Sequence, residues 1–112
     1  MEEIWKSIKN YSNYECSNLG NVRNKKTKEL VKQDLSYKNK GTKNYYRINI
    51  KPNKGHYKTF FTHVLICLVF NGNKPVSIKN EKWVVNHKDN DKHNNRADNL
   101  EWITQSNNMF MR

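Results

Sequence analysis

A histidine that directly follows an asparagine, in Asn86-His87, is the feature of this sequence best suited to chemistry. The apolar residues 83–85 before it predict a short strand, and a second apolar run at residues 100–103 predicts another. A polar loop at residues 88–98 joins these strands. The end of a strand fixes the orientation of an imidazole, which can then take a proton from a water molecule.

The residues after the second strand predict a helix that completes this unit. Thr104 opens the helix and Asn108 lies on it, so that a polar side chain projects back toward the histidine. A strand–loop–strand–helix unit can hold a divalent cation between carbonyl or carboxylate oxygens, with the imidazole close by. The cation would neutralise charge on a scissile phosphate and on its leaving oxygen. The sequence therefore predicts the parts that phosphodiester hydrolysis requires.

The other histidines and the acids of the loop have simpler interpretations. His63 begins an apolar helix, where a packed and hydrogen-bonded histidine is favoured over phosphate contact or support of the site. His93 lies in the polar loop and His56 lies beside a turn, so both are expected to face solvent. Asp89 and Asp91 lack the spacing of acids that an EF-hand calcium loop needs.

The net charge of the chain is +11, from 21 Lys and Arg residues against 10 Asp and Glu residues, and its sequence pI is 9.8. This excess favours contact with nucleic-acid phosphates over a merely soluble basic protein. Cys16 and Cys67 lie far apart, and the absence of a paired-cysteine motif excludes a zinc knuckle. Each cysteine is expected to act as a small buried hydrophobe.

The N-terminus and the apolar runs bear on where the protein acts. The chain starts with Met1-Glu2-Glu3, which is acidic and is not followed by the apolar segment of a signal peptide. The longest apolar run, residues 64–70, is far too short to cross a membrane. We therefore expect a cytoplasmic protein that is neither secreted nor bound to a membrane.

Turn residues and apolar alternation predict a chain rich in short strands. Residues 18–21 form a turn between strand-like pieces at residues 14–17 and 21–23, and Trp5 and Ile8 are apolar anchors before them.

The middle of the chain predicts surface loops followed by a hairpin. The lysine-rich residues 25–44 favour loops and weak strands at the surface. Residues 45–50 and 57–61 predict strands joined by a turn at residues 51–55. The first strand alternates, which places Tyr46, Ile48 and Ile50 on one side.

A helix is expected to follow this hairpin directly. Thr62 is the predicted N-cap of a helix over residues 63–70. Asn71-Gly72 is expected to end it. The predicted apolar stripe consists of Val64, Leu65, Leu68 and Val69.

At these residues the sequence resembles the HNH homing endonuclease family, the ββα-metal nucleases of phages, introns and large DNA viruses. The motifs that carry the resemblance are Asn86-His87, Asn94-Asn95, Asn99-Leu100-Glu101-Trp102 and Asn107-Asn108. Residues 62–70 are similar to the helix that precedes the HNH core in this family. Residues 4–8 and 14–23 resemble the modular DNA-binding motif that often accompanies these nucleases.

The resemblance implies a role for each matching residue. His87 would be the general base, and Asn86 and Asn108 would be metal ligands, with Asn107 as the alternative to Asn108. Asn99 would orient the histidine-bearing loop through hydrogen bonds. The cofactor implied is one divalent ion, Mg²⁺ or Mn²⁺. Many relatives have Asp in place of Asn86, so here the site would depend on the DNA phosphate for negative charge.

Taken together, these features predict an α+β protein of small β-hairpins and a ββα-metal core, with residues 1–50 binding DNA and residues 51–112 forming the nuclease. The expected function is metal-dependent cleavage of double-stranded DNA in a bacterial or virus-infected cell. The alternatives are a DNA-binding protein without activity and a basic RNA-binding module. Many members of that family carry a further C-terminal DNA-binding module, whereas this sequence stops at Arg112, so a homodimer is a further expectation. The expected DNA contacts are Arg23, Lys25, Lys26, Lys28 and Arg96.

Overall fold

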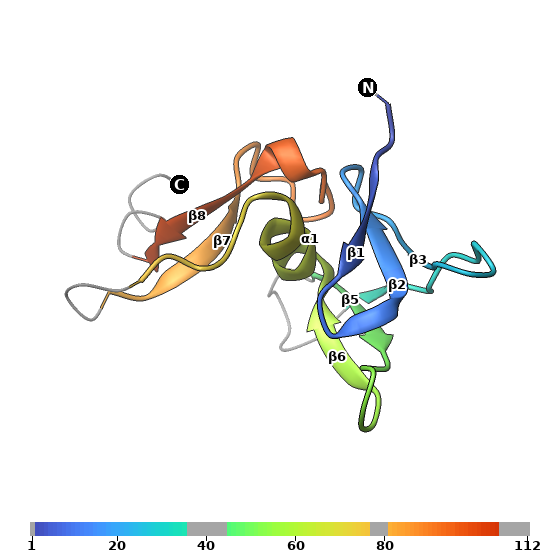
Figure 1. The fold of residues 1–112 in the computed structure, drawn as a ribbon. Coiled ribbons are helices and arrows are strands. Elements are labelled where there is room, and N and C mark those ends of the chain that lie inside the picture. The colour runs from blue at the N-terminus through green and yellow to red at the C-terminus, as the bar shows by residue number, and fades with distance from the viewer. Residues whose placement is uncertain (1, 36–44, 77–80, 106–112) are drawn as a thin grey trace.

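The computed structural model describes residues 2–35, 45–76 and 81–105 (Figure 1). Its elements, in chain order, are β1 (Trp5–Ile8), β2 (Tyr11–Ser17), β3 (Val22–Asn24), β4 (Asp34–Leu35), β5 (Tyr46–Ile50), β6 (Lys58–Phe61), α1 (Thr62–Phe70), β7 (Trp83–His87), the 3₁₀ helix η1 (Ala97–Asn99) and β8 (Leu100–Thr104). The strands form sheets in the orders β1-β2-β3, β4-β5-β6 and β7-β8.

The N-terminal sheet is antiparallel and is built around the predicted turn. The predicted strand at residues 14–17 is confirmed as part of β2, and the one predicted at residues 21–23 is found as β3, which begins and ends one residue later. The residues that the sequence marks only as apolar anchors, Trp5 and Ile8, begin and end the additional strand β1. Gly20 N donates to Ser17 O at 3.0 Å, which closes the turn between β2 and β3.

The central sheet contains the predicted hairpin, in which β5 pairs with β6 from Arg47↔Phe61 to Ile50↔Lys58. Ile48 and Ile50 are buried on one side of β5, as the alternation predicts. The hairpin spans the predicted boundary between residues 50 and 51, so its pairing connects the two predicted parts. Part of the lysine-rich stretch, residues 36–44, lies outside the described residues.

The helix α1 corrects the prediction at its start. Thr62 is the first helical residue rather than the N-cap, and Phe61 takes the N-cap position with φ −71° and ψ 128°. Because Phe61 is also the last residue of β6, the strand enters the helix without a loop. The Thr62 hydroxyl is buried and has no hydrogen-bond partner within the described ranges. The predicted end is confirmed, since Asn71 N donates to Cys67 O at 2.8 Å.

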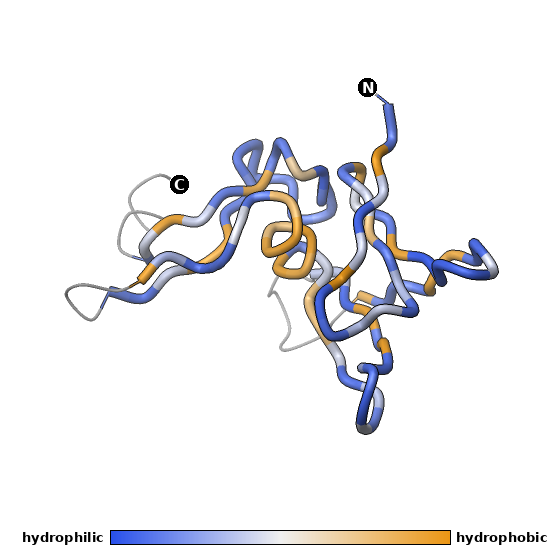
Figure 2. The backbone as a smooth tube through the Cα atoms, in the orientation of Figure 1, coloured by the Kyte–Doolittle hydropathy of each residue, from blue (hydrophilic) through white to orange (hydrophobic). Residues whose placement is uncertain are grey.

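The apolar stripe predicted on α1 is too narrow. Leu65 is buried as expected, but Ile66 and Cys67 are buried as well, whereas Val64 and Leu68 are only half-buried. The reason is the position of α1 in the middle of the molecule, in contact with β1, β2, β5, β6, β7 and β8 (Figures 1 and 2). A helix with neighbours on several sides does not show a single buried stripe.

The core surrounds α1 where the sheets meet. Its buried members are Ile8, Cys16, Val22, Ile48, Ile50, Leu65, Ile66, Cys67, Ala97 and Leu100. Cys16 and Cys67 are free and buried, which confirms the prediction of small buried hydrophobes. Burial raises the pKa of the Cys16 thiol to about 12, so this cysteine remains an uncharged thiol. No helix in the described parts of the chain is long and apolar enough to cross a membrane.

A close backbone approach joins the N-terminal sheet to the loop after β7. Gly20 has φ +92°, and a Cβ atom there would lie 3.0 Å from the carbonyl oxygen of Asn95. In the same region, Ala97 N donates to Asn18 O at 2.8 Å. The turn between β2 and β3 therefore contacts the polar loop directly, and only glycine fits at position 20.

Substitution of Gly20 by alanine is expected to destabilise the fold more than the same change at Gly72. Both glycines have positive φ, +92° and +88°, but a Cβ at Gly72 would meet nothing within 4 Å. The backbone strain, about 1–3 kcal/mol, is therefore shared by both variants. Overpacking against Asn95 should cost Gly20→Ala about 1–3 kcal/mol more. Chemical denaturation of both variants measures the difference, and equal losses would contradict the close approach.

Candidate active site

The predicted strand pair around the histidine is confirmed as the antiparallel hairpin of β7 and β8. Asn86 lies opposite Glu101, and His87 lies opposite Leu100, at the end of β7 nearest the loop. Lys88 N donates to Asn99 O at 2.8 Å, which continues the ladder beyond β7. The hairpin therefore holds the histidine at a fixed place on a paired strand.

The imidazole of His87 is buried, with 5 % of the residue exposed. Its Nε2 lies 2.8 Å from Oδ1 of Asn95, in the loop that follows β7. Burial is the main cause that lowers the pKa of His87, and the positive charge of Lys92 adds to it. The hydrogen bond to Asn95 and the carboxylates of Asp89 and Asp91 act in the opposite direction. A lowered pKa keeps the imidazole neutral, which is the form that accepts a proton.

Aromatic rings from distant parts of the sequence pack against this imidazole. The ring of His63 lies 5.0 Å from that of His87, and Tyr45 stacks on His63 at 4.7 Å and faces His87 at 6.0 Å. Lys92 Nζ lies 3.0 Å from the Tyr45 hydroxyl and 4.7 Å from its ring centre. No pattern in the sequence connects Tyr45 or Lys92 with His87, because only the folded chain brings them to the histidine.

His63 is buried as predicted, with 7 % of the residue exposed, but the prediction of a satisfied histidine needs correction. Its Nδ1 is buried without a hydrogen-bond partner among the described residues. Burial, followed by the nearby charges of His87 and Lys92, lowers the pKa of His63 to about 3. The reason for the difference is that the His63 ring packs against the rings of Tyr45 and His87 rather than against polar groups.

The buried neutral state of His63 predicts that the protein loses stability as the pH falls. The pKa is about 3 in the folded chain, against an ordinary value of 6.5, so between these values only the unfolded chain binds the proton. This contribution should cost about 1.4 kcal/mol per pH unit below pH ~6. Urea denaturation at about pH 7 and about pH 5 gives the free energy of unfolding of wild type and of His63→Phe at each pH. Identical pH slopes for both proteins would contradict a buried neutral His63.

Asn99 connects the two ends of the polar loop. Its Nδ2 donates to Asp89 Oδ1 and to Asn94 O, both at 2.9 Å, and its Oδ1 accepts from Asp89 N at 3.1 Å. Asp89 also accepts from Asp91 N and from Asn94 Nδ2, both at 2.8 Å. These hydrogen bonds lower the pKa of Asp89 and use its carboxylate within the loop. The geometry suits the bracing role predicted for Asn99, which stays a prediction.

Asn86 faces a carboxylate across the hairpin. Its Nδ2 donates to Glu101 Oε2 at 2.9 Å. The amide oxygen of Asn86 is therefore the atom of this side chain that could coordinate a cation. Carboxylate and amide oxygens are the hard donors that Mg²⁺ takes, so this pair fits the predicted ion in kind. The other predicted ligand, Asn108, and its alternative Asn107 lie outside the described residues. Within those residues, no group of three or more His, Cys, Asp and Glu side chains could hold a metal.

Glu101 is the residue of this pair for which the sequence alone predicts no role. It belongs to the quoted motif, but only the register of β7 and β8 shows that it faces Asn86. If the two strands are paired residue by residue from His87 and Leu100, the next pair is Asn86 and Glu101.

Three of the five basic residues expected to contact DNA make contacts within the N-terminal sheet and the turn that follows β3. Arg23 Nε donates to Glu15 Oε2, and the guanidinium lies 3.8 Å above the ring centre of Trp5. Lys28 Nζ lies 3.6 Å from the same carboxylate, and Lys25 Nζ donates to Ser7 Oγ.

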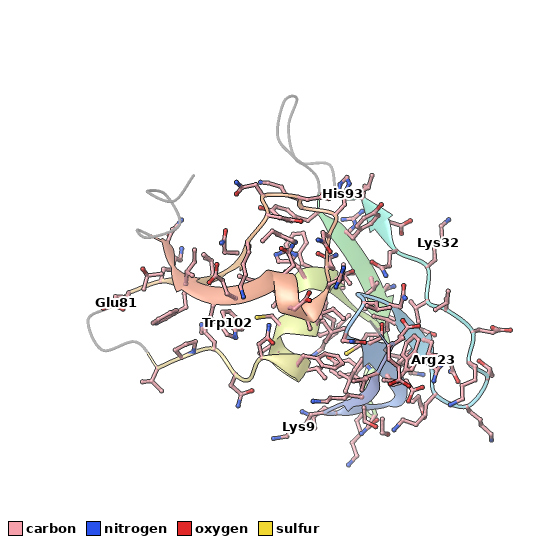
Figure 3. All side chains as sticks on the ribbon, turned by 90° about the horizontal axis from the view of Figure 1, so that it is seen from above. Lys9, Arg23, Lys32, Glu81, His93 and Trp102 are labelled. Atoms are coloured by element: carbon pink, nitrogen blue, oxygen red, sulfur yellow. The ribbon has the colours of Figure 1, made fainter. Side chains whose placement is uncertain are left out.

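The remaining expected contacts are exposed. Lys26 is exposed, and Arg96 forms an exposed ion pair with Asp98 at 3.3 Å. Figure 3 shows Arg23 and Lys32 on the N-terminal sheet side, away from Glu81. Contact of these residues with DNA stays a prediction.

Both halves of the chain match known protein families. Residues 60–110 match the HNH endonuclease family, and residues 3–59 match the NUMOD4 motif. The chain is 39% identical over 96% of its length to an HNH endonuclease, L247, of Acanthamoeba polyphaga mimivirus. It is 37% identical over 90% of its length to the DNA endonuclease I-HmuI of Bacillus phage SP01.

A solved structure of the HNH homing endonuclease I-HmuI, in a study of its DNA binding and cleavage, covers 99% of this chain with a TM-score of 0.75 and 35% identity. This likeness fits the predicted α+β class. The chain spans 25% of the length of L247, 52% of that of I-HmuI and 57% of the solved I-HmuI chain. By these matches, residues 60–110 belong to the HNH endonuclease family, and the N-terminal half of the chain carries a NUMOD4 motif.

Proposed function

We propose that this chain is a metal-dependent DNA endonuclease that hydrolyses phosphodiester bonds with His87 as the general base. The observation that carries the proposal is the imidazole of His87, which is buried at the end of β7 directly after Asn86, the residue that faces Glu101 across the hairpin. A general base and hard oxygen donors on one hairpin are the kinds of group that this hydrolysis needs. The family membership supports the same chemistry.

Each residue of the site has a distinct task in this proposal. His87 takes the proton from the attacking water, and its buried surroundings keep it neutral for that purpose. Asn99 keeps the loop after His87 in place through its hydrogen bonds to Asp89 and Asn94. Asn86 and Asn108 are the proposed protein ligands of Mg²⁺ or Mn²⁺. When bound, the ion would neutralise charge on the scissile phosphate and on the leaving oxygen.

Double-stranded DNA is the proposed substrate, and the N-terminal sheet is the proposed part that holds it. The net charge of +11 supports contact with phosphates. The relative I-HmuI is an HNH homing endonuclease of a Bacillus phage, and a homing role in a phage or another DNA virus is proposed here on that likeness.

The test of this function is cleavage of supercoiled plasmid by the purified chain, with Mg²⁺ or Mn²⁺ and with a chelator. Nicked or linear DNA should form only with the metal. A chain that binds the plasmid but leaves it supercoiled would be a DNA-binding protein without activity. A chain that instead binds RNA more tightly than DNA, and cuts neither, would support the basic RNA-binding module.

The variant Asn86→Asp is expected to bind metal more tightly in the absence of DNA. The new carboxylate adds a charge at ligand distance and faces Glu101, whose carboxylate lies 2.9 Å from the present amide nitrogen. A cation between the two carboxylates relieves their repulsion, so Mn²⁺ affinity should rise by about tenfold or more. Cleavage should then reach half of its maximal rate at a lower Mg²⁺ concentration.

Calorimetric titration with Mn²⁺ and a Mg²⁺ series of cleavage rates measure both effects. Glu101→Gln is the matched control, because it removes the neighbouring charge while leaving Asn86 in place. If Asn86→Asp needs as much metal as wild type, Asn86 is not a ligand and the metal site is built from other residues.

A further inference from the structure

We propose that Asn95 is a positioning residue that keeps the ring proton of His87 on Nε2, so that Nδ1 is the atom that accepts the proton from water. The inference rests on the proposed role of His87 as general base. It names the reacting nitrogen and assigns the residue that selects it.

The contact itself defines the tautomer. His87 Nε2 lies 2.8 Å from Asn95 Oδ1, and both residues are 5 % exposed. An amide oxygen only accepts hydrogen bonds, so the nitrogen facing it must carry the proton. In a neutral imidazole the other nitrogen then carries the lone pair. The opposite tautomer would place two lone pairs against each other in a buried position, which is unfavourable.

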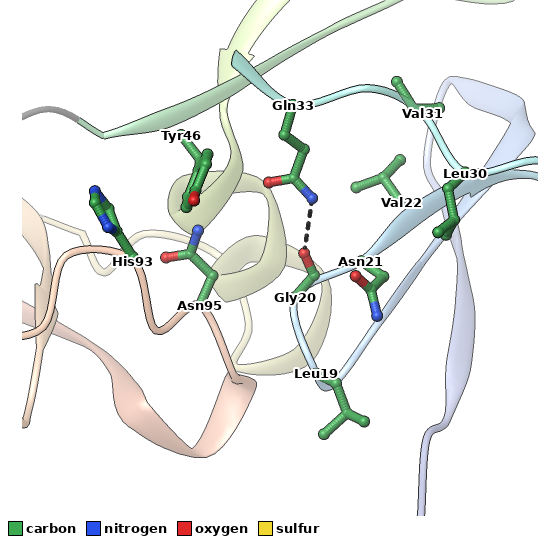
Figure 4. Close-up of a pocket in the computed structure, with 10 residues that line it drawn as sticks. All are labelled: Leu19, Gly20, Asn21, Val22, Leu30, Val31, Gln33, Tyr46, His93 and Asn95. Carbon is green, nitrogen blue, oxygen red and sulfur yellow. Dashed lines mark hydrogen bonds between the residues drawn. The ribbon is translucent and has the colours of Figure 1, made fainter. Parts of the chain in front are cut away.

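The side chain of Asn95 can select a tautomer because its backbone is held from both sides. On one side, Gly20 lies so close that a Cβ atom there would be 3.0 Å from Asn95 O and 3.1 Å from Asn95 Cβ (Figure 4). On the other side, Asn99 Nδ2 donates to the carbonyl of Asn94 at 2.9 Å. The neighbouring Ala97 N donates to Asn18 O at 2.8 Å. The N-terminal sheet thus takes part in building the active site.

The imidazole is also confined, so it cannot exchange its nitrogens by rotating. The rings of His63 and Tyr45 lie 5.0 Å and 6.0 Å from it. A ring flip would require both neighbours to move within a packed region. The hydrogen bond to Asn95 therefore sets one tautomer for the folded chain rather than one of two alternating states.

The tautomer can be read directly by long-range ¹H–¹⁵N NMR of the histidine rings in the full chain, without reference to cleavage. In wild type, the His87 Nε2 signal should be that of a protonated nitrogen and the Nδ1 signal that of an unprotonated one. A wild-type ring with its proton on Nδ1 would overturn the proposal, whatever the variants do.

Two substitutions at Asn95 separate the acceptor from the shape. Asn95→Leu keeps a similar volume but removes the oxygen, so the ring should become a mixture of tautomers. Its kcat should fall about tenfold to hundredfold with KM unchanged, as is typical when the group orienting a functional histidine is lost. Asn95→Asp keeps an oxygen in place and should restore the Nε2–H tautomer and most of kcat. Asn49→Leu, an amide-to-leucine change at an exposed position of β5, is the matched control.

The outcomes distinguish this inference from the proposed function. If Asn95→Leu leaves both the tautomer and kcat unchanged, Asn95 does not position His87. Loss of kcat with an unchanged tautomer, or without rescue by Asn95→Asp, would also overturn the inference. If the tautomer shifts in Asn95→Leu but the wild-type chain does not cleave DNA, the positioning holds and the proposed function fails.

Discussion

The variant His87→Ala should cleave DNA about 10²–10⁴ times more slowly than the wild-type chain, because that is the usual cost of losing a general base. Binding of DNA should stay nearly unchanged, since the predicted phosphate contacts lie on the N-terminal sheet and the exposed part of the loop. Single-turnover cleavage at saturating protein gives the rate, and fluorescence anisotropy in the presence of a chelator gives the affinity. The two measurements together separate the chemical step from binding.

The control for this variant must allow for the burial of His87. Removing a buried ring lowers stability, so thermal unfolding of His87→Ala should confirm that the chain is folded at the assay temperature. His93→Ala removes an exposed histidine from the same loop and should cleave at nearly the wild-type rate. A His87→Ala variant that is folded and cuts at more than about a tenth of the wild-type rate would exclude His87 as the base.

DNA affinity should fall steeply as salt increases, since phosphate contacts release condensed counterions. If about four phosphates are neutralised, a fourfold rise in salt should weaken binding by about 150-fold, with a log–log slope near −0.9 per contact. The net charge of +11 makes several such contacts reasonable for a chain of 112 residues. Anisotropy titrations at increasing potassium chloride, without divalent metal, measure the slope.

Single lysines can be tested against the same slope. Lys26→Gln should make the slope about one unit shallower if Lys26 contacts a phosphate. Lys54→Gln, in the turn between β5 and β6, is the matched control. A wild-type affinity that does not change with salt would remove the electrostatic basis for DNA binding.

The parts of the fold that follow from neighbouring residues could be predicted from the sequence. The turn at residues 18–21, the hairpin of β5 and β6, and the strands that flank the loop all have local signals of turn residues and alternation. The start of α1 could not be predicted in this way. Thr62 has the side chain of an N-cap, but β6 continues to Phe61 and enters the helix directly. The N-cap position therefore falls on Phe61, which makes no side-chain capping hydrogen bond.

The same distinction holds for the candidate site. Asn86, His87 and Asn99 stand in one motif, and the structure brings them together in the hairpin and its loop. Tyr45 and His63 reach His87 only through the packing of the central sheet and α1, and no sequence pattern near His87 indicates them. Their contribution depends on long-range contacts.

Arg23 shows that the charge of a residue does not by itself predict a DNA contact. Arg23 appears in a basic stretch, which favours a phosphate contact. In the structure it pairs with Glu15, its neighbour across β2 and β3, and stacks on Trp5 of β1. The sequence cannot show this arrangement without the register of the sheet. Arg23 therefore stabilises the N-terminal sheet, whether or not it also contacts DNA.

The most direct test of the central claim is a metal-start experiment with the wild-type chain. The chain is first bound to supercoiled plasmid in the presence of a chelator, and excess Mg²⁺ is then added while samples are taken over time. We expect intact supercoiled plasmid before the addition and nicked or linear plasmid afterwards, at a rate that His87→Ala reduces by about 10²-fold or more. Plasmid that stays supercoiled after Mg²⁺ is added, or that is cut equally well before it, would contradict the account.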